Sequence, residues 1–236
     1  MSTTARFRRL AGAACLVLGP VLLTIGFAVL PWHPDGETEL ESLNSTAANL
    51  TATQLGDLLV FLGILAMVPA TLAVMRAVGR RAPVLGLVGG ILSIAGFVAM
   101  MIAVVNDQVV IALADTAALR PAAADALDSS PAWVLNVVLV VFLGGMLIGG
   151  IVLGVALLRS RVVPAWAAWA VIAAPFVSFA AHAVDRQAVD VASGLMTAVA
   201  YALLAQRVLA ADDAAWEAGE VAGAPAPRGV TVGATS

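Results

Sequence analysis

The segment A-W-V-L-N-V-V-L-V-V-F-L-G-G-M-L-I-G-G-I-V-L-G-V-A-L-L fills residues 132–158 and contains no charged side chain. About 20 apolar residues in a helix are enough to cross the hydrocarbon core of a bilayer, which is about 30 Å thick. The rest of the chain has the same character, since 61% of its 236 residues are hydrophobic and 11% are charged. Soluble domains contain about 45–50% apolar and about 25% charged residues. The composition therefore indicates an integral membrane protein.

Further apolar segments of spanning length lie on both sides of this one. We predict an all-α bundle of six transmembrane helices, at about residues 8–30, 53–78, 83–106, 132–158, 165–184 and 187–209. The first segment is longer than the apolar region of a signal peptide and lacks a cleavage site, so we expect it to remain as a helix. The tail, residues 210–236, is acidic and then rich in Gly, Pro and Ala, a composition typical of disorder.

Two longer polar segments, residues 31–52 and 107–130, connect helices on the same side of the predicted bundle. We expect them to cover the helix ends there. Thr51 and Gln54 have the spacing of a capping box, which predicts the start of the second helix. Apolar residues continue beyond residue 106, so we expect the third helix either to project from the membrane or to turn at that point.

The arginines determine the predicted orientation, because positively charged residues are enriched in cytoplasmic loops. Six helices place nine arginines on one side, namely Arg6, Arg8, Arg9, Arg76, Arg80, Arg81, Arg159, Arg161 and Arg207. Only Arg120 and Arg186 fall on the opposite side, with most of the acidic residues. We therefore predict a cell-membrane protein with both termini in the cytoplasm and the acidic loops outside.

Glycines recur at four-residue spacing in the third and fourth predicted helices. Small residues at this spacing allow helix backbones to approach closely within a membrane. The candidate packing positions are Gly86, Gly90, Gly145, Gly149, Gly150 and Gly154. The pattern favours packing within one chain; the alternative is a face on the fourth helix that contacts a second copy or a partner subunit.

Most of the polar residues near the predicted helices lie at the outer level. They are His33, Asp57, Asn106, Asp107, Asn136, His182, Asp185, Arg186 and Asp190. Charged groups in spanning helices usually face the bundle interior or a wet cavity, so these residues form a candidate polar pocket. The alternative is that they contact water and headgroups at the membrane surface. Asp57 and Asn136 lie deepest, and for these two we expect an interior position.

The motifs of soluble catalysis and nucleotide binding do not occur in the sequence. The single cysteine and two histidines give no recognisable metal site, so we predict neither a metal nor another cofactor. The net charge of −3 gives no indication of nucleic-acid binding. The predicted partner is the lipid bilayer.

Three short motifs carry a resemblance to a known group of proteins. They are R-F-R-R-L-A-G at residues 6–12, F-A-V-L-P-W-H-P-D-G at residues 27–36 and L-R-S-R-V-V-P at residues 158–164. Over about residues 6–209 the chain resembles a broad family of bacterial multi-pass integral membrane proteins of unknown function. The resemblance implies six helices and transfers no catalytic residue.

Three functional hypotheses follow. The first is a non-catalytic membrane protein whose outward polar pocket binds or passes a small solute, an ion or a lipid headgroup. The second is an accessory subunit that packs on a partner through the glycine-rich fourth helix. The third is an enzyme acting on a lipid-borne substrate, with His182 and one of Asp57, Asp185 and Asp190 as an acid–base pair.

Overall fold

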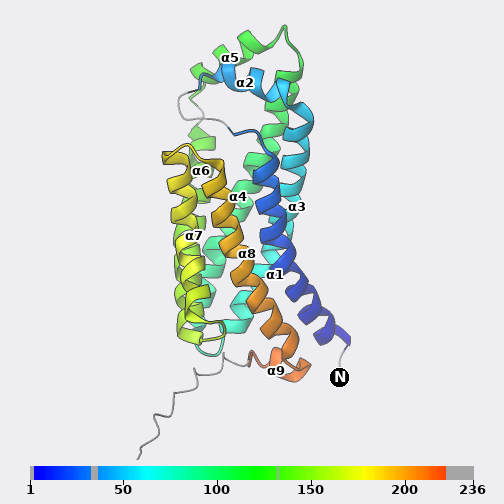
Figure 1. The fold of residues 1–236 in the computed structure, drawn as a ribbon, viewed down its shortest axis with the longest axis vertical. Coiled ribbons are helices and arrows are strands. Elements are labelled where there is room, and N and C mark those ends of the chain that lie inside the picture. Colours follow the sequence, from blue (N-terminus) through cyan, green and yellow to red (C-terminus); the bar gives the residue numbers. More distant parts are fainter. Residues whose placement is uncertain (1–2, 33–36, 132, 222–236) are drawn as a thin grey trace, which may run out of the picture.

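A computed structural model describes residues 3–32, 37–131 and 133–221 of the chain (Figure 1). This part of the chain is helical and contains no β-strand. The helices are α1 (Thr3–Val29), α2 (Glu39–Ala48), α3 (Leu50–Val78), α4 (Pro83–Asp115), α5 (Arg120–Ser129), α6 (Trp133–Ser160), α7 (Ala165–Ala183), α8 (Gln187–Ala210) and α9 (Asp213–Glu217).

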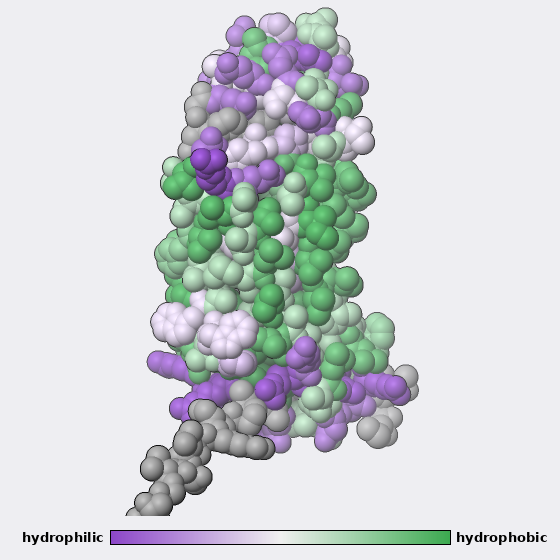
Figure 2. Space-filling model, viewed as in Figure 1, coloured by the Kyte–Doolittle hydropathy of each residue, from purple (hydrophilic) through white to green (hydrophobic). Residues whose placement is uncertain are grey.

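Six of these helices, α1, α3, α4, α6, α7 and α8, are long and apolar enough to cross a membrane. This confirms the predicted all-α class and the predicted number of spanning helices. Figure 2 shows the consequence on the surface, where a broad hydrophobic band separates two hydrophilic ends. The protein is therefore a multi-pass membrane protein whose helices contact the lipid bilayer.

The six spanning helices form a closed ring. Along the ring α1 packs on α3, α3 on α4, α4 on α6, α6 on α7, α7 on α8, and α8 returns to α1. Only a few contacts cross the ring, between α3 and α6. A ring of six helices must fill its centre with side chains or leave a space there, and this bundle does both at different depths.

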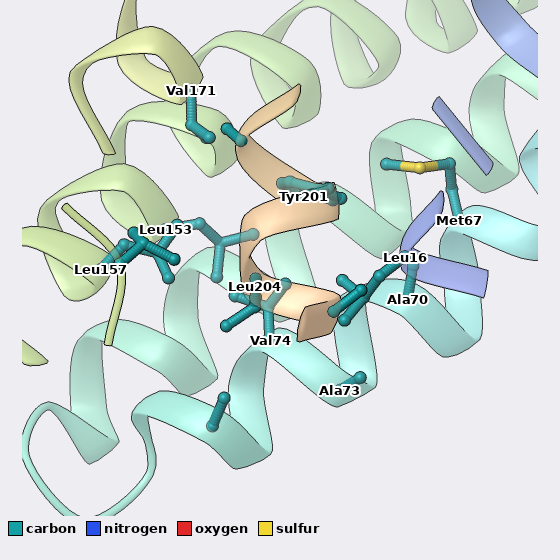
Figure 3. Packing of buried hydrophobic residues seen from close by; sticks show 14 of the residues in the cluster. Leu16, Met67, Ala70, Ala73, Val74, Leu153, Leu157, Val171, Tyr201 and Leu204 are labelled. Carbon is teal, nitrogen blue, oxygen red and sulfur yellow. The ribbon is translucent and has the colours of Figure 1, made fainter. Parts of the chain in front are cut away.

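A continuous apolar core packs between the spanning helices, and Figure 3 shows part of it from close by. Leu16 of α1, Val74 of α3, Leu153 of α6 and Leu204 of α8 are each almost completely buried in it. Tyr201, Val171 and Met67 belong to the same cluster (Figure 3). Leu16, Val74, Leu153 and Leu204 lie toward the end of the bundle that carries the arginine-containing turns, which we call the arginine end, and Val60 and Val104 continue the core toward the opposite end.

The glycines of α4 and α6 lie where these two helices cross. A Cβ atom added to Gly145 would lie 2.6 Å from the Cα of Gly96, and one added to Gly149 would lie 2.7 Å from the backbone nitrogen of Ser93. Gly154 faces α7 instead, close to Ile172. Gly86 and Gly90 approach Val78 and Met75 of α3. Packing within the chain therefore occupies this glycine surface.

The opposite end of the bundle carries a small helical cap, and we call it the cap end. Helix α4 continues to Asp115, beyond the predicted end at residue 106, and α2 and α5 pack beside its extension (Figure 1). Leu43, Ala114, Ala123 and Ala124 form a separate buried cluster between these three helices. The continuing apolar pattern of α4 thus extends the helix and supports a cap at this end.

The capping box predicted at Thr51 and Gln54 was wrong, because these residues lie inside α3, which begins at Leu50. A capping box is present instead at the start of α2. There the Thr38 side chain accepts from the backbone N–H of Glu41, and a Glu41 carboxylate oxygen accepts from the backbone N–H of Thr38. Thr followed three residues later by Gln or Glu occurs at both places, so the local pattern could not identify the helix start.

The prediction of a disordered tail from residue 210 was also wrong for residues 210–221. Helix α9 packs against the arginine end, where the Trp216 side chain is only 3% exposed. Arg9 donates a 2.9 Å hydrogen bond to Asp213, and Arg76 donates to the backbone oxygens of Trp216 and Glu217. Residues 222–236 lie outside the described residues.

Candidate functional site

A cavity of about 750 Å³ occupies the centre of the ring in its cap-end half. Its wall comes mainly from α1, α4, α6, α7 and α8, with Met67 from α3. The lining begins at Pro20 on α1 and extends past the end of that helix to Trp32. Ligand pockets in proteins usually have volumes of about 300–1,000 Å³, so this space is large enough for a small organic molecule.

Helix α6 explains why the ring is open at this depth. Its close approaches to α4 and α7 involve residues from Gly145 onward, where glycines permit backbone contact. Its first turns, from Trp133 to Val141, are exposed almost all the way round. The helix therefore diverges from its neighbours toward the cap end, and the centre of the ring is not filled there.

The cavity wall is mostly apolar. Large side chains such as Phe27, Phe97, Met100, Phe142 and Met146 line it. Pro20 and Pro175 also lie in the wall, and both helices continue through them. A wall of this kind suits the hydrocarbon part of a ligand better than a hydrated solute or ion.

Polar side chains gather at the cap end of the cavity. Ser178 of α7 donates a 2.5 Å hydrogen bond from Oγ to Oδ1 of Asp190, which lies in the first turn of α8. The Nδ1 atom of His182 lies 3.0 Å from the backbone oxygen of Ser178. Because a carbonyl oxygen can only accept, Nδ1 carries the proton and Nε2 is an acceptor when the ring is neutral.

Trp32 links the end of α1 to this group. Its indole N–H donates to Asp185, and its ring lies 4.9 Å from the His182 ring, centroid to centroid, at an interplanar angle of 43°. Asp185 has a φ of 51°, a left-handed conformation that Asp adopts more readily than most residues. Gln187 adds a second link, because its amide donates to the backbone oxygens of Phe27 and Leu30 at the end of α1.

Asp57 is buried, as expected, with 4% of its surface exposed, but it does not line the cavity. Its Oδ2 atom accepts a 2.9 Å hydrogen bond from Nε2 of Gln108. Gln108 lies on α4 where that helix leaves the predicted membrane span. Asp57 thus belongs to a contact between α3 and α4, separate from the polar group at His182.

The prediction that Asn136 faces the interior of the bundle was wrong. Asn136 lies on the diverging first turns of α6, is exposed and does not line the cavity. Asn106, Asp107 and Arg186 are exposed as well. His33 lies outside the described residues. Of the predicted pocket residues, the described cavity wall therefore contains His182 and Asp190, and Asp185 contacts it through Trp32.

Sequence reasoning did not select Ser178, Trp32, Gln108 or Ser193 as site residues. Ser178 lies four residues before His182, and Ser193 lies three residues after Asp190. Each serine is therefore about one helical turn from a predicted site residue, and this spacing could have identified both. Trp32 follows the end of α1 and lines the cavity. Gln108 gave no separate signal, because its partner depends on how α3 and α4 align.

The described geometry gives neither a metal cluster nor a direct contact between a histidine and a carboxylate. Among the described residues no group of three or more His, Cys, Asp or Glu side chains is placed to hold a metal ion. Among the described residues, Ser178 connects His182 to Asp190. Its backbone oxygen accepts from His182, and its hydroxyl donates to Asp190. An acid–base pair requires a direct or water-bridged contact with the reacting group, and the described geometry gives no direct one.

A second pocket, of about 370 Å³, lies at the arginine end beside Arg80 and Arg81. Contacts within the chain occupy both guanidinium groups. Arg80 forms an ion pair with Glu220, and Arg81 donates a 2.5 Å hydrogen bond to the backbone oxygen of Ser160. These arginines connect the turns and the segment after α9, and the central cavity remains the better candidate site.

Comparisons with protein-family models, with curated proteins and with solved structures find no match to this chain.

Proposed function

We propose that this membrane protein binds an amphipathic molecule from the bilayer, with the apolar part of the ligand inside the ring and its polar head at the cap end. The observation that carries the proposal is the central cavity, whose aromatic and aliphatic wall ends in Ser178, His182 and Asp190. Burial of apolar surface contributes about 25 cal/mol per Å². The hydrocarbon part therefore supplies affinity, and the polar end positions the head.

Binding is better supported than passage across the membrane. The cavity lining stops near Pro20 on α1 and Met67 on α3, and below this level Leu16, Val74 and Leu153 fill the ring. A solute crossing the protein would have to displace this buried core. A lipid-like ligand needs an opening toward the bilayer only, and the divergence of α6 provides exposed helix flanks at that depth.

The glycine-rich helix α6 gives little support to the accessory-subunit hypothesis, because its close-packing glycines contact α4 and α7. The enzyme hypothesis has less support, because among the described residues His182 does not form a hydrogen bond with an aspartate. For orientation we propose the arrangement predicted from the arginines: the arginine end in the cytoplasm, both termini there, and the cavity open toward the outer leaflet of the cell membrane.

The experiment that tests the proposal measures binding of radiolabelled dodecanol to the full chain in nanodiscs of zwitterionic lipid. We expect saturable binding near one molecule per chain. Leu143→Trp, which enlarges a side chain in the cavity wall, should abolish the saturable component. Val140→Trp lies on the same helix, outside the described cavity wall, and is 69% exposed before substitution, so this control should bind normally. The proposal would be contradicted if dodecanol partitioned equally into empty nanodiscs and into nanodiscs with the unmodified protein, Leu143→Trp or Val140→Trp.

A further inference from the structure

The polar end of the cavity offers hydrogen-bond acceptors and negative charge, and three of its donors are already engaged. From this we infer that the ligand's head is a cation, so that the protein binds a cationic amphiphile with an ammonium head group. The inference rests on the proposed function, because it names the head group of the same ligand in the same cavity.

The charge at this end is negative. Asp190 is the only acidic side chain in the described part of the cavity wall, which contains no arginine. The nearest arginine in sequence, Arg186, is exposed and does not line the cavity. Asp190 is half-buried, and a ligand that covers it would remove its carboxylate from water, which is costly without a charged partner. A ligand cation would supply that partner, whereas a carboxylate, sulfate or phosphate head would add a second negative charge beside the first.

Three hydrogen-bond donors of the polar end are engaged within the chain, and the Ser193 hydroxyl is not among them. The Trp32 indole N–H donates to Asp185, the Ser178 hydroxyl donates to Asp190, and the Nδ1–H of neutral His182 is directed to the Ser178 backbone oxygen. An anionic head needs several donors, as in sites built from backbone N–H groups or arginines. The cavity therefore provides little that would stabilise an anion.

Acceptors, by contrast, are available. Oδ1 of Asp190 receives the Ser178 hydroxyl, and no second protein partner is recorded for this carboxylate among the described residues. In neutral His182, Nε2 is a further acceptor. Ser193 lines the cavity with 7% of its surface exposed, and its hydroxyl can accept or donate. Each of these atoms can contact a positively charged head.

Aromatic rings complete the environment. Trp32, His182, Phe27 and Phe179 all line the cavity near its polar end. Aromatic faces, and Trp in particular, attract ammonium groups through the ring quadrupole, and the attraction is stronger when water is excluded. An acidic side chain among aromatic rings therefore suits an ammonium head, while the wall below it suits an alkyl chain.

The test compares three radiolabelled probes with the same chain: dodecyltrimethylammonium, dodecanol and dodecyl sulfate. Each is bound to the full chain in nanodiscs of zwitterionic lipid, with empty nanodiscs subtracted. We expect the ammonium probe to bind about tenfold or more tightly than the alcohol, because its charge is attracted by Asp190 and by the aromatic faces although it has no N–H to donate. Dodecyl sulfate should bind more weakly than the alcohol.

Asp190→Asn then removes the charge and keeps an oxygen that can accept from Ser178. This variant should lose the preference for the ammonium probe and still bind dodecanol, which also shows that it is folded. Asp128→Asn, on the exposed surface of α5, is the matched control and should behave as the unmodified protein.

The two proposals fail in distinguishable ways. If dodecanol binds saturably but the unmodified protein ranks the three heads equally, or ranks the sulfate first, the cationic head is wrong and the proposed function stands. The same conclusion follows if Asp190→Asn keeps the full ammonium preference. If none of the three probes binds saturably, the proposed function is wrong, and the head-group inference falls with it.

Discussion

Gln108 of α4 donates a 2.9 Å hydrogen bond from Nε2 to Oδ2 of Asp57, a buried carboxyl group in the spanning helix α3. Asp57 lies about two turns inside α3, while Gln108 lies where α4 emerges toward the cap. The contact therefore joins the wall of the bundle to the base of the cap. It also satisfies a polar group that would otherwise lie in an apolar environment.

Gln108→Ala should destabilise the protein by about 1–3 kcal/mol, because it leaves the buried Asp57 oxygen without its donor. Thermal unfolding in detergent, followed by tryptophan fluorescence, measures the loss. Asn106→Ala, an exposed position on the same helix, is the control and should unfold at the same temperature as the unmodified protein. Equal stability of the two variants would show that the hydrogen bond makes no net contribution.

The burial of Asp57 could be predicted from the sequence, but its partner could not. An acid within an apolar segment has few alternatives to the bundle interior, so its burial is a local inference. Whether it meets Gln108 or His182 depends on which helices are neighbours around the ring. The six spanning helices were predictable for the same local reason, since segment length and hydropathy suffice.

Gly145→Ala should be strongly destabilising, whereas Gly144→Ala should be tolerated. A Cβ at Gly145 would lie 2.6 Å from the backbone of Gly96, which cannot move aside without separating α4 from α6. Overpacking of this kind typically costs about 1–3 kcal/mol or more. At Gly144 nothing lies within 4 Å of the added atom, and alanine favours the helix by about 0.5–1 kcal/mol. Thermal stability of both variants in one detergent provides the comparison.

If Gly145→Ala and Gly144→Ala destabilise the protein equally, the close crossing between α4 and α6 does not explain the loss of stability. If Gly144→Ala alone is harmful, that glycine contacts a second chain. The latter result would restore the partner-subunit hypothesis.

Trp216→Ala should release α9 from the arginine end. The indole is buried, and the Arg76 guanidinium lies 5.7 Å from its centroid, so the substitution removes both an apolar contact and a cation–π contact. Loss of a buried tryptophan typically costs about 3–5 kcal/mol. Faster tryptic cleavage at Arg207 would report the release, and Glu217→Ala, at an exposed neighbouring position, should leave the cleavage rate unchanged.

Glu41 should stabilise α2 in a pH-dependent manner. The backbone N–H of Thr38, and then its hydroxyl, lower the pKa of Glu41 below its ordinary value of 4.5. A group whose pKa is lowered by folding stabilises the folded state above its unfolded pKa, and this contribution disappears as the pH falls through the folded value. Amide exchange in α2 should therefore be slower in the unmodified protein than in Glu41→Gln at about pH 6, and equal in the two at about pH 3.

A difference between these two proteins that persists at the lower pH would show that the Glu41 charge does not stabilise the helix start. Thr38→Ala removes the hydroxyl donor and should reduce the pH dependence, which makes it the second variant to measure.

The cavity was the part of the site least accessible to sequence reasoning. His182 and Asp190 were identified because they are polar residues in an apolar chain. The space they border exists because α6 diverges from its neighbours beyond Gly145, and no local pattern records that divergence. Asn136 shows the same limit of sequence reasoning. A residue one turn inside a spanning helix can face either the centre of the ring or the lipid, and its position in the sequence does not decide between them.

The proposed orientation makes a prediction that two single-cysteine proteins can test. Cys15 is the only cysteine, so Cys15→Ala provides a cysteine-free background. Ala122→Cys places a thiol on exposed α5 at the cap end, and Ala214→Cys places one on exposed α9 at the arginine end. Both substitutions start from alanine and leave every arginine in place, so they do not alter the charge bias that sets the orientation. In intact cells a membrane-impermeant maleimide should label Ala122→Cys at once and Ala214→Cys only after the membrane is permeabilised. The reverse pattern would place the arginine end outside, and the cavity would then open toward the inner leaflet, so that any ligand would have to enter from the cytoplasmic side.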